Sequence, residues 1–317
     1  MLVRLYYISL FVFLFVSLIL FVLYALGVIP EVWRWYYYAY IIAALSHIWF
    51  IYILLTIGDF KKRVFEPYED EKFAVIIPCY NEDYRLVGAT IDSIKQAEGN
   101  KVIYLVDDGS WNGVSEHLDA YANAGDIVLY TLPENRGKRE AVHTAVKHLP
   151  EDIDYVIMMD SDTVVSKKAL VRIVGALKTG NIGAASGNIK LLNEDENLLT
   201  KMIGAYYWTA LGIQRRAQSA LGMVACCSGA LAGYRAYILR KEIDGFLHEK
   251  FLDEQCTYSE DRHLTNLVLR SGYDVVFMPT ATAYTHTPST YKAFMLQQLR
   301  WRRGFIKESL FAMTFMW

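Results

Sequence analysis

Two aspartates separated by one residue, Asp160 and Asp162, directly follow the apolar run YVIMM. Such a run predicts a short buried strand, so both carboxylates are expected just beyond its end. Carboxylates at this spacing supply hard oxygen ligands for Mg²⁺ or Mn²⁺, and an ion held in this way usually bridges a diphosphate. The alternative is an Asx-type turn, in which the side chains only cap the backbone. A second acidic pair, Asp107 and Asp108, ends the run KVIYLVDD and favours the metal site, unless it forms a plain Asp-Gly turn.

Two adjacent cations follow a glycine in the segment ENRGKR, where Gly137 precedes Lys138 and Arg139. They fall in the first turn of a predicted helix, where positive charge opposes the helix dipole unless an anion lies beside it. A diphosphate is such an anion, and two solvated cations are the alternative.

The segment SEDRHLTNLVLR places Glu260 and Asp261 at the start of another predicted helix. The helix dipole favours acids there, so a purely structural role would explain the pair. A metal ion, a diphosphate and acids that can bind a nucleobase or a ribose together describe a nucleotide-sugar site. Such a site also needs a general base that takes the proton of the acceptor hydroxyl. Asp261 is the candidate for this general base.

The composition of the 317-residue chain, 54% of it hydrophobic, allows a domain of more than 200 residues together with membrane segments. The net charge of -2 gives no basic excess, so nucleic acid is not expected as a partner. The four cysteines, Cys79, Cys226, Cys227 and Cys256, show no CxxC spacing, and a zinc site is not expected.

Apolar runs alternate with helical patterns through the middle of the chain. Strands are expected at 73–78, 101–108, 126–132 and 155–162, and helices at 85–97, 114–124, 138–148 and 167–178. This alternation predicts an α/β fold with a mainly parallel sheet and helices on both faces. Ligands bind beyond the carboxyl ends of such strands, and the polar clusters lie there. Neither GxGxxG nor GxxxxGK[ST] occurs, which disfavours a dinucleotide dehydrogenase and a P-loop ATPase.

Two long apolar runs, 5–29 and 36–58, are each long enough to span a bilayer and predict two transmembrane helices. The basic residues Lys61, Lys62 and Arg63 follow the second run, so this end is expected in the cytoplasm. The sequence therefore predicts an integral protein of the inner (plasma) membrane with its catalytic domain in the cytoplasm and the lipid bilayer as a partner.

The ordered motifs IIPCYNE, VDDGS, ENRGKR, DSDT, SEDRHLT and QQLRW resemble those of the processive family 2 glycosyltransferases, over residues 73–305. The likeness is greatest to hyaluronan synthases and to chitin or chitooligosaccharide synthases. It implies a GT-A fold, inverting transfer from UDP-sugar donors to a growing polysaccharide acceptor, and Mg²⁺ or Mn²⁺ as cofactor.

The resemblance also implies roles for the residues that bind the donor. Tyr80, Glu82 and Asp108 match residues around the uridine. Lys138 and Arg139 match residues that contact the diphosphate.

The residues for metal, base and acceptor are implied in the same way. Asp160 and Asp162 match the metal-binding DxD motif, with Asp162 in direct contact. Asp261, which follows Glu260, matches the general base. Cys256 either lines the acceptor site or only packs in the protein interior.

The QxxRW motif matches Gln297, Arg300 and Trp301. Arg300 is expected near the diphosphate and Trp301 beneath the acceptor sugar, since an aromatic face suits the apolar face of a pyranose.

Three domains are expected. Residues 1–64 contain the two transmembrane helices and the basic flank, and residues 65–288 form the cytoplasmic GT-A domain. Residues 289–317 form an amphipathic interfacial helix that carries QxxRW, followed by the start of a truncated membrane segment. Because the family continues into further membrane helices, a truncated chain, a compact natural version and a homo-oligomer are all left open.

The product is open as well. Hyaluronan synthesis, which alternates UDP-N-acetylglucosamine and UDP-glucuronate, is slightly preferred over chitin-type synthesis, which uses only the first donor. A uronate would need a cation such as Arg235, Arg262 or Arg300. A membrane protein that binds nucleotide sugars without catalysis is the alternative of another class, but the metal acids and the base are both present. A lipid-linked single-sugar transferase is disfavoured by the QxxRW motif.

Overall fold

The computed structural model describes residues 65–68 and 70–316, together with residues 35, 39–40, 42–43, 45–47, 49–50 and 53. The predicted span 5–29 and the basic flank 61–63 lie outside the described residues, and the predicted span 36–58 lies largely outside them.

The first half of the sheet is parallel. Its strands are β1 (Lys72–Cys79), β2 (Asn100–Asp107), β3 (Val128–Thr131) and β4 (Tyr155–Met158). The helices between and after them are α3 (Tyr84–Gln96), α4 (Val114–Asn123), α5 (Lys138–Lys147) and α6 (Ala169–Lys178). The predicted alternation of strands and helices is thus confirmed, with each boundary shifted by only a few residues.

The second half of the sheet is mixed. It contains β6 (Ile182–Leu191), β7 (Ala232–Arg235), β10 (Asp274–Thr285) and the two-residue β5 (Val164–Val165). The strand order is β3-β2-β1-β4-β7-β6-β10-β5, and β7 runs antiparallel to both of its neighbours. The sequence analysis placed no strand at β6 and did not predict this antiparallel insertion.

Two helices of the second half pack on each other beside the sheet. They are α9 (Ala236–Leu247) and α10 (Glu260–Arg270), joined by a small hairpin of β8 (Lys250–Phe251) and β9 (Glu254–Gln255). The helix α9 packs on α5, and α10 packs on α9 and β10, so the acids at the start of α10 are held against the sheet.

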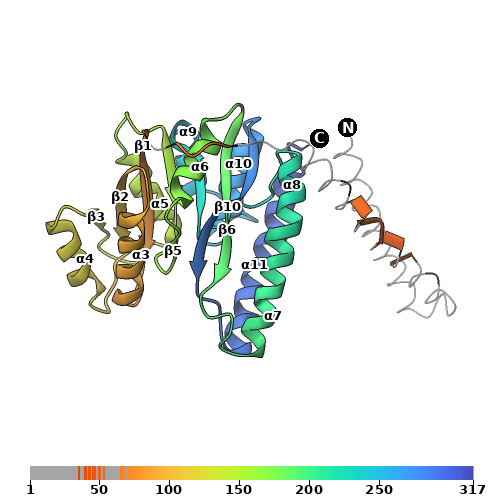
Figure 1. The fold of residues 1–317 in the computed structure, drawn as a ribbon, viewed down its shortest axis with the longest axis horizontal. Coiled ribbons are helices and arrows are strands. Elements are labelled where there is room, and N and C mark those ends of the chain that lie inside the picture. Colours follow the sequence, from red (N-terminus) through yellow and green to blue (C-terminus); the bar gives the residue numbers. More distant parts are fainter. Residues whose placement is uncertain are drawn as a thin grey trace.

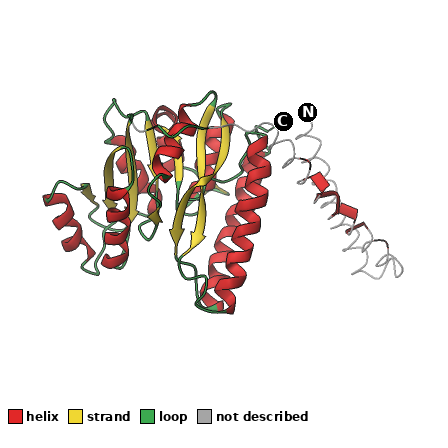
Figure 2. Ribbon diagram, in the orientation of Figure 1, coloured by secondary structure: helices red, strands yellow, loops and turns green. Residues whose placement is uncertain are grey.

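Two long helical segments stand at one end of the sheet, opposite β3 and α4 (Figure 1). The first is a continuous rod of α7 (Leu198–Tyr207), a π-helical stretch η1 (Trp208–Arg215) and α8 (Arg216–Ala220). The second is α11 (Tyr291–Ala312), which carries the QxxRW motif. Figure 2 shows both as helices beside the long strands of the sheet. The predicted final helix is confirmed, whereas its place at a membrane surface stays a prediction.

The central strands are buried on both faces, which explains their continuous apolar sequences. Residues 73–77 of β1 and 156–157 of β4 are fully buried. Burying one such side chain contributes about 1.5–3 kcal/mol, so this core fixes the strand register firmly. Two backbone bonds continue the register past the strand ends, from Asp108 N to Cys79 O at 2.8 Å and from Met159 N to Ile76 O at 3.0 Å. The polar loops that follow β1, β2 and β4 therefore meet at one edge.

The predicted localisation needs a correction. Within the described part of the chain, none of the helices combines the length and the apolar character required to cross a bilayer. Even α11, with 22 residues, is interrupted by charged residues such as Arg302, Arg303 and Lys307. This finding contradicts the prediction of an integral membrane protein with transmembrane helices.

Candidate active site

Three carboxylates meet beyond the ends of β1 and β4. Asp160 and Asp162 follow β4, and Glu82 from the loop after β1 accepts a hydrogen bond from Ser161 Oγ at 3.3 Å. Burial raises the pKa of Asp162, and the negative charges of Asp160 and Glu82 raise it further. Asp162 therefore feels the negative charge of both other acids, and carboxylate oxygens are the donors that a hard divalent ion prefers. They fit the predicted Mg²⁺ or Mn²⁺.

Lys138 joins this acidic group to the start of α10. Its Nζ lies 2.5 Å from Asp160 Oδ1 and 3.0 Å from Glu260 Oε1. Burial alone would lower the pKa of Lys138, but the two carboxylates outweigh burial and raise it, so the ammonium stays charged. The structure thus brings together the predicted diphosphate contact, the predicted metal site and the predicted base motif. A cation here can neutralise charge on a phosphate that comes to the metal.

The adjacent acids Glu260 and Asp261 have pKa values shifted in opposite directions. Burial alone would raise the pKa of Glu260, but Lys138 holds it below its usual value. Burial and the neighbouring charge of Glu260 raise the pKa of Asp261, against the opposing effect of Lys138. Such divergence separates a permanent anion from a proton acceptor, which matches the role predicted for Asp261.

Two contacts hold Asp261 against the segment before β7. The thiol of Cys226 lies 3.6 Å from Asp261 Oδ2. One helical turn along α10, Thr265 Oγ1 donates to Asp261 O at 2.8 Å and accepts from Cys227 N at 2.9 Å. The same segment reaches Asp160 of the predicted metal site, because a Cβ on Gly229 would stand 3.3 Å from Asp160 Oδ1 and 3.1 Å from Lys138 Nζ. The segment therefore forms a wall shared by the acidic group and the base.

The VDDGS acids are engaged with the backbone. Asp107 accepts from Ser110 N at 3.1 Å and from Ser115 Oγ at 2.7 Å. Asp108 accepts from Arg136 N and Gly137 N, both at 2.8 Å, and its pKa is raised by burial against these two bonds. Asp108 therefore fixes the loop that presents Lys138.

Two other residues expected around the uridine lie after β1. Tyr80 is exposed directly beyond this strand, and Asn81 next to it donates through its backbone to Ser110 Oγ at 2.8 Å. The loop after β1 is thereby tied to the loop after β2. Tyr80 and Glu82 thus share one loop, while the acids of VDDGS lie beneath it.

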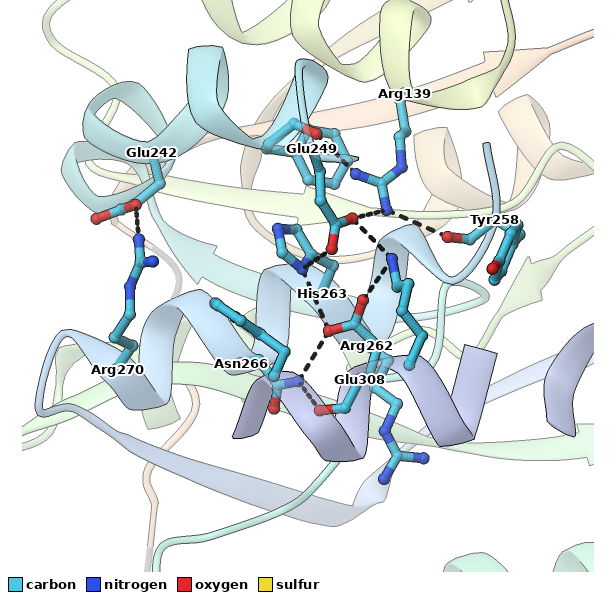
Figure 3. Close-up of polar contacts among 12 residues, drawn as sticks. Arg139, Glu242, Glu249, Tyr258, Arg262, His263, Asn266, Arg270 and Glu308 are labelled. Carbon is cyan, nitrogen blue, oxygen red and sulfur yellow. Dashed lines mark hydrogen bonds and ion pairs between the residues drawn. The ribbon is translucent and has the colours of Figure 1, made fainter. Parts of the chain in front are cut away.

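Arg139 points elsewhere. Its guanidinium is buried and donates to Phe246 O at 2.7 Å, to Glu249 Oε2 at 2.6 Å and to Tyr258 O at 3.1 Å (Figure 3). Cys256 is buried in the same region, where burial and the charge of Glu249 raise the pKa of its thiol. The structure therefore separates both residues from the group around Asp160 and Asp261.

The QxxRW residues lie on α11. The ring centres of Trp301 and Tyr207 lie 6.4 Å apart. Burial chiefly raises the pKa of Tyr207 to about 12, and the negative charges of Asp160 and Asp162 add to this increase. Trp301 is therefore connected to the metal acids through one aromatic neighbour. Arg300 is exposed, and Gln297 has a buried Oε1 without a hydrogen-bond partner.

Arg215 is a candidate site residue that the sequence did not suggest. It ends the π-helical stretch η1 and donates to Ser186 Oγ at 3.0 Å. The positive charge of Arg215 also acts on Tyr207 and on Cys226, where it opposes the burial that raises the pKa of each. Long π-helical stretches are rare and often lie at functional sites, but their hydrogen-bond shift leaves no clear mark in a sequence.

A second group of ligand-type side chains, Glu249, His263 and Glu308, lies beneath the site. Lys307 Nζ is 2.7 Å from Glu249 Oε2 and 2.7 Å from Glu308 Oε1, so a lysine already provides the positive charge between these carboxylates. Lys138 likewise lies beside Asp160, so neither group is free of a lysine, and Asp160 and Asp162 stay the predicted metal ligands on the grounds of their DxD spacing.

Comparisons with known proteins give the family of the chain. A family model described as Glycosyl transferase family 2 matches residues 74–242. The N-acetylglucosaminyltransferase of Neorhizobium galegae is 35% identical over 243 residues, which is 75% of this chain and 56% of that protein. The N-acetylglucosaminyltransferase of Mesorhizobium japonicum is 36% identical over 245 residues, 75% of this chain and 57% of that protein. The chain thus spans a little over half the length of these relatives.

Solved structures show the same fold. The mannosyltransferase PcManGT from Pyrobaculum calidifontis, in complex with GDP-Man and Mn²⁺, matches with a TM-score of 0.62 at 19% identity, over 86% of this chain and 74% of that one. S. aureus TarS 1-349 matches with a TM-score of 0.50 at 16% identity, over 68% of this chain and 60% of that one. The predicted GT-A type of α/β fold is confirmed. Since the family model and the relatives each match more than half of the chain, it belongs to glycosyl transferase family 2, the family that its motifs resemble.

Proposed function

We propose that this chain transfers N-acetylglucosamine from UDP-N-acetylglucosamine to a hydroxyl of a growing saccharide, with inversion at the anomeric carbon. The observation that carries the proposal is the bridge formed by Lys138, which holds the metal acid Asp160 and the start of α10 within one ion-paired group. The relatives named above are N-acetylglucosaminyltransferases, which supports this sugar as the one transferred.

The proposed reaction is a single displacement. The carboxylate of Asp261 takes the proton of the acceptor hydroxyl while the acceptor oxygen bonds to the anomeric carbon. The bond from that carbon to the diphosphate oxygen breaks, and UDP leaves with the electron pair. Lys138 offsets the charge that develops on the departing diphosphate. A divalent ion at Glu82, Asp160 and Asp162 would supply further positive charge for that diphosphate.

Repeated addition to one chain is the further part of this proposal. The aromatic pair of Trp301 and Tyr207 offers a platform for the apolar face of an acceptor pyranose. A single product chain can then stay bound while its terminal hydroxyl faces Asp261. This proposal covers chitin-type oligosaccharides, made from UDP-N-acetylglucosamine alone, and hyaluronan, which needs UDP-glucuronate as well.

The arginines named for a uronate favour the first product. Arg235 donates to Ile182 O at 2.7 Å and to Gly180 O at 2.8 Å, so it serves the backbone. The guanidinium of Arg262 lies 4.4 Å from the centre of the Phe305 ring. Of the three, Arg300 alone makes neither kind of contact in the described part of the chain. Arg235 and Arg262 are thus engaged, which leaves Arg300 as the one candidate cation for a uronate, and the relatives favour N-acetylglucosamine.

The test is UDP release by the purified chain with Mn²⁺ or Mg²⁺, measured with UDP-N-acetylglucosamine alone, UDP-glucuronate alone and both together. We expect full turnover with UDP-N-acetylglucosamine alone and a chitinase-sensitive product. A rate that rises only with both donors, giving a hyaluronidase-sensitive polymer, would establish the hyaluronan alternative. Binding of UDP without turnover of any donor would favour a non-catalytic protein.

Trp301→Ala tests the acceptor platform. We expect transfer to an oligosaccharide acceptor to fall about twofold to tenfold from lost stacking alone, which is worth about 0.5–1.5 kcal/mol, and further from the lost buried area. Hydrolysis of the donor by water should stay within about twofold, because the acids and Lys138 are unchanged. The matched control is Trp208→Ala, which removes an exposed tryptophan from the neighbouring rod. Equal losses of transfer and hydrolysis would mean that Trp301 only supports the fold.

A further inference from the structure

Five charged or titratable side chains form a buried group, called here the charged cluster: Arg139, Glu249, His263, Lys307 and Glu308. Each contact within it is short, between 2.6 Å for Arg139 to Glu249 and 3.2 Å for His263 to Glu308. Arg139 belongs to α5, His263 to α10, and Lys307 and Glu308 to α11. The cluster therefore joins the three helices that carry Lys138, Asp261 and Trp301.

The charges within the cluster are complete without any ligand. Lys307 bridges the two carboxylates, and Arg139 adds a second cation at Glu249. Burial alone would raise the pKa of Glu308, but its bonds to His263 and Lys307 outweigh burial and lower that pKa to about 2. Removing one member would leave an opposite charge buried and unpaired, which is strongly unfavourable.

The cluster holds α11 to the first turns of α10. His263 Nδ1 lies 3.2 Å from Glu308 Oε2, and Asn266 Nδ2 donates to the same oxygen at 2.9 Å and to the backbone carbonyl of Glu308 at 3.0 Å (Figure 3). His263 follows Asp261 by two residues on this helix. If α11 slid along its axis or rotated about it, Glu308 would move and disturb the first turns of α10, which carry Asp261.

The acceptor side of α11 is tied to the same point. Gly304 packs so closely on Ser259, the residue before α10, that a Cβ at this position would overlap Ser259 Oγ. Ser259 itself has a φ of 58°, a left-handed conformation that is rarely adopted by residues other than glycine. Trp301 lies seven residues, or about 10 Å along the helix, before Glu308. The close contact at Gly304 stands between them, so the register of α11 sets the distance from Trp301 to Asp261.

We propose that Lys307 and Glu308 are positioning residues, which fix the register of α11 so that the acceptor on Trp301 meets the carboxylate of Asp261. This inference rests on the proposed function, because it assigns Trp301 to the acceptor and Asp261 to its deprotonation. Neither Lys307 nor Glu308 touches the reacting atoms, since both are buried beneath them in the charged cluster. Their effect is exerted through the packing of α11 on α10.

The experiment compares Lys307→Met with Lys307→Arg and with Lys147→Met. The arginine keeps the charge, and Lys147 forms an exposed ion pair with Asp244 at 2.8 Å, so its loss is a matched control. For each variant, UDP release and sugar incorporation from UDP-N-acetylglucosamine are measured in the same sample, together with the affinity for UDP in Mn²⁺. Asn266→Ala, which removes an uncharged donor to the carboxylate and the backbone carbonyl of Glu308, carries the test if Lys307→Met does not fold.

For Lys307→Met, or for Asn266→Ala in its place, incorporation should fall about tenfold to a hundredfold, because small displacements of bound reactants have effects of this size. UDP affinity should stay within about twofold, as should all properties of Lys147→Met. The excess of UDP released over sugar incorporated should rise, and Lys307→Arg should restore the coupling. A merely structural role would lower release and incorporation in proportion, and that result would overturn the inference.

Two other outcomes are distinguishable. If the wild-type chain turns over no nucleotide sugar, the proposed function fails before the variants are compared. If the chain binds Mn²⁺ or Zn²⁺ with a stoichiometry that Glu308→Gln reduces and Asp162→Ala does not, the cluster is a metal site and the positioning role is wrong.

Discussion

Asp261→Asn is expected to lower the rate of sugar transfer about 10²–10⁴-fold, the range that a positioned general base contributes. Asparagine keeps the size of the side chain but cannot accept the acceptor proton. The affinity for UDP in Mn²⁺ should be nearly unchanged, because Asp160, Asp162 and Lys138 remain. Steady-state kinetics and a UDP titration on the same preparation measure both quantities. Transfer close to the wild-type rate would remove Asp261 as the base.

Stability against pH provides an independent check on this variant. Burial and the charge of Glu260 raise the pKa of Asp261, so its ionised form destabilises the native state. This cost is absent below the ordinary aspartate pKa and is complete once the pH has risen through the folded-state pKa. Asp261→Asn should therefore unfold at a higher temperature than the wild type at neutral pH, and the difference should vanish in acid. The wild-type transfer rate should rise with pH through the same raised pKa, as a base becomes active on losing its proton.

Asp162→Ala should weaken the binding of UDP in Mn²⁺ about a hundredfold, since a metal ion contributes several kcal/mol to interactions with phosphoryl oxygens. The substitution removes one of three carboxylates that converge on the proposed ion. Without metal, UDP should bind the variant as well as the wild type or slightly better, because one charge that repels the diphosphate has gone. Calorimetric titrations with Mn²⁺ and with EDTA measure the two cases.

The control for Asp162 is Asp152→Ala, which breaks an exposed ion pair with Lys72 at 2.7 Å. It should leave the metal dependence of UDP binding intact. If the wild-type affinity for UDP is the same with Mn²⁺ and with EDTA, the assignment of Asp160 and Asp162 to a metal site is wrong.

The parallel half of the fold could be predicted because its central strands, β1 and β4, are buried on both faces. Continuous apolar runs such as residues 73–77 carry that information locally, and the helical periods between them do the same. The second half could not be predicted as well. Strand β7 has only four residues and enters between β4 and β6 in the antiparallel direction, which depends on contacts distant in sequence.

The directions of individual side chains in the site could not be predicted from local sequence. Lys138 and Arg139 are adjacent cations, yet successive residues on a helix point about 100° apart, so the two cannot face one ligand equally. Lys138 meets Asp160, and Arg139 enters the charged cluster. Arg215 was missed for a related reason, because only the π-helical stretch turns it toward Ser186.

The central claim is a single displacement of UDP from N-acetylglucosamine, with Asp261 as base. Its most direct test is the anomeric configuration of the new linkage, measured by proton NMR on product made from α-linked UDP-N-acetylglucosamine and an oligosaccharide acceptor. The account predicts a β linkage, because one displacement inverts the anomeric carbon. An α linkage would contradict it, since retention needs a different arrangement of catalytic groups from a lone carboxylate at the acceptor hydroxyl.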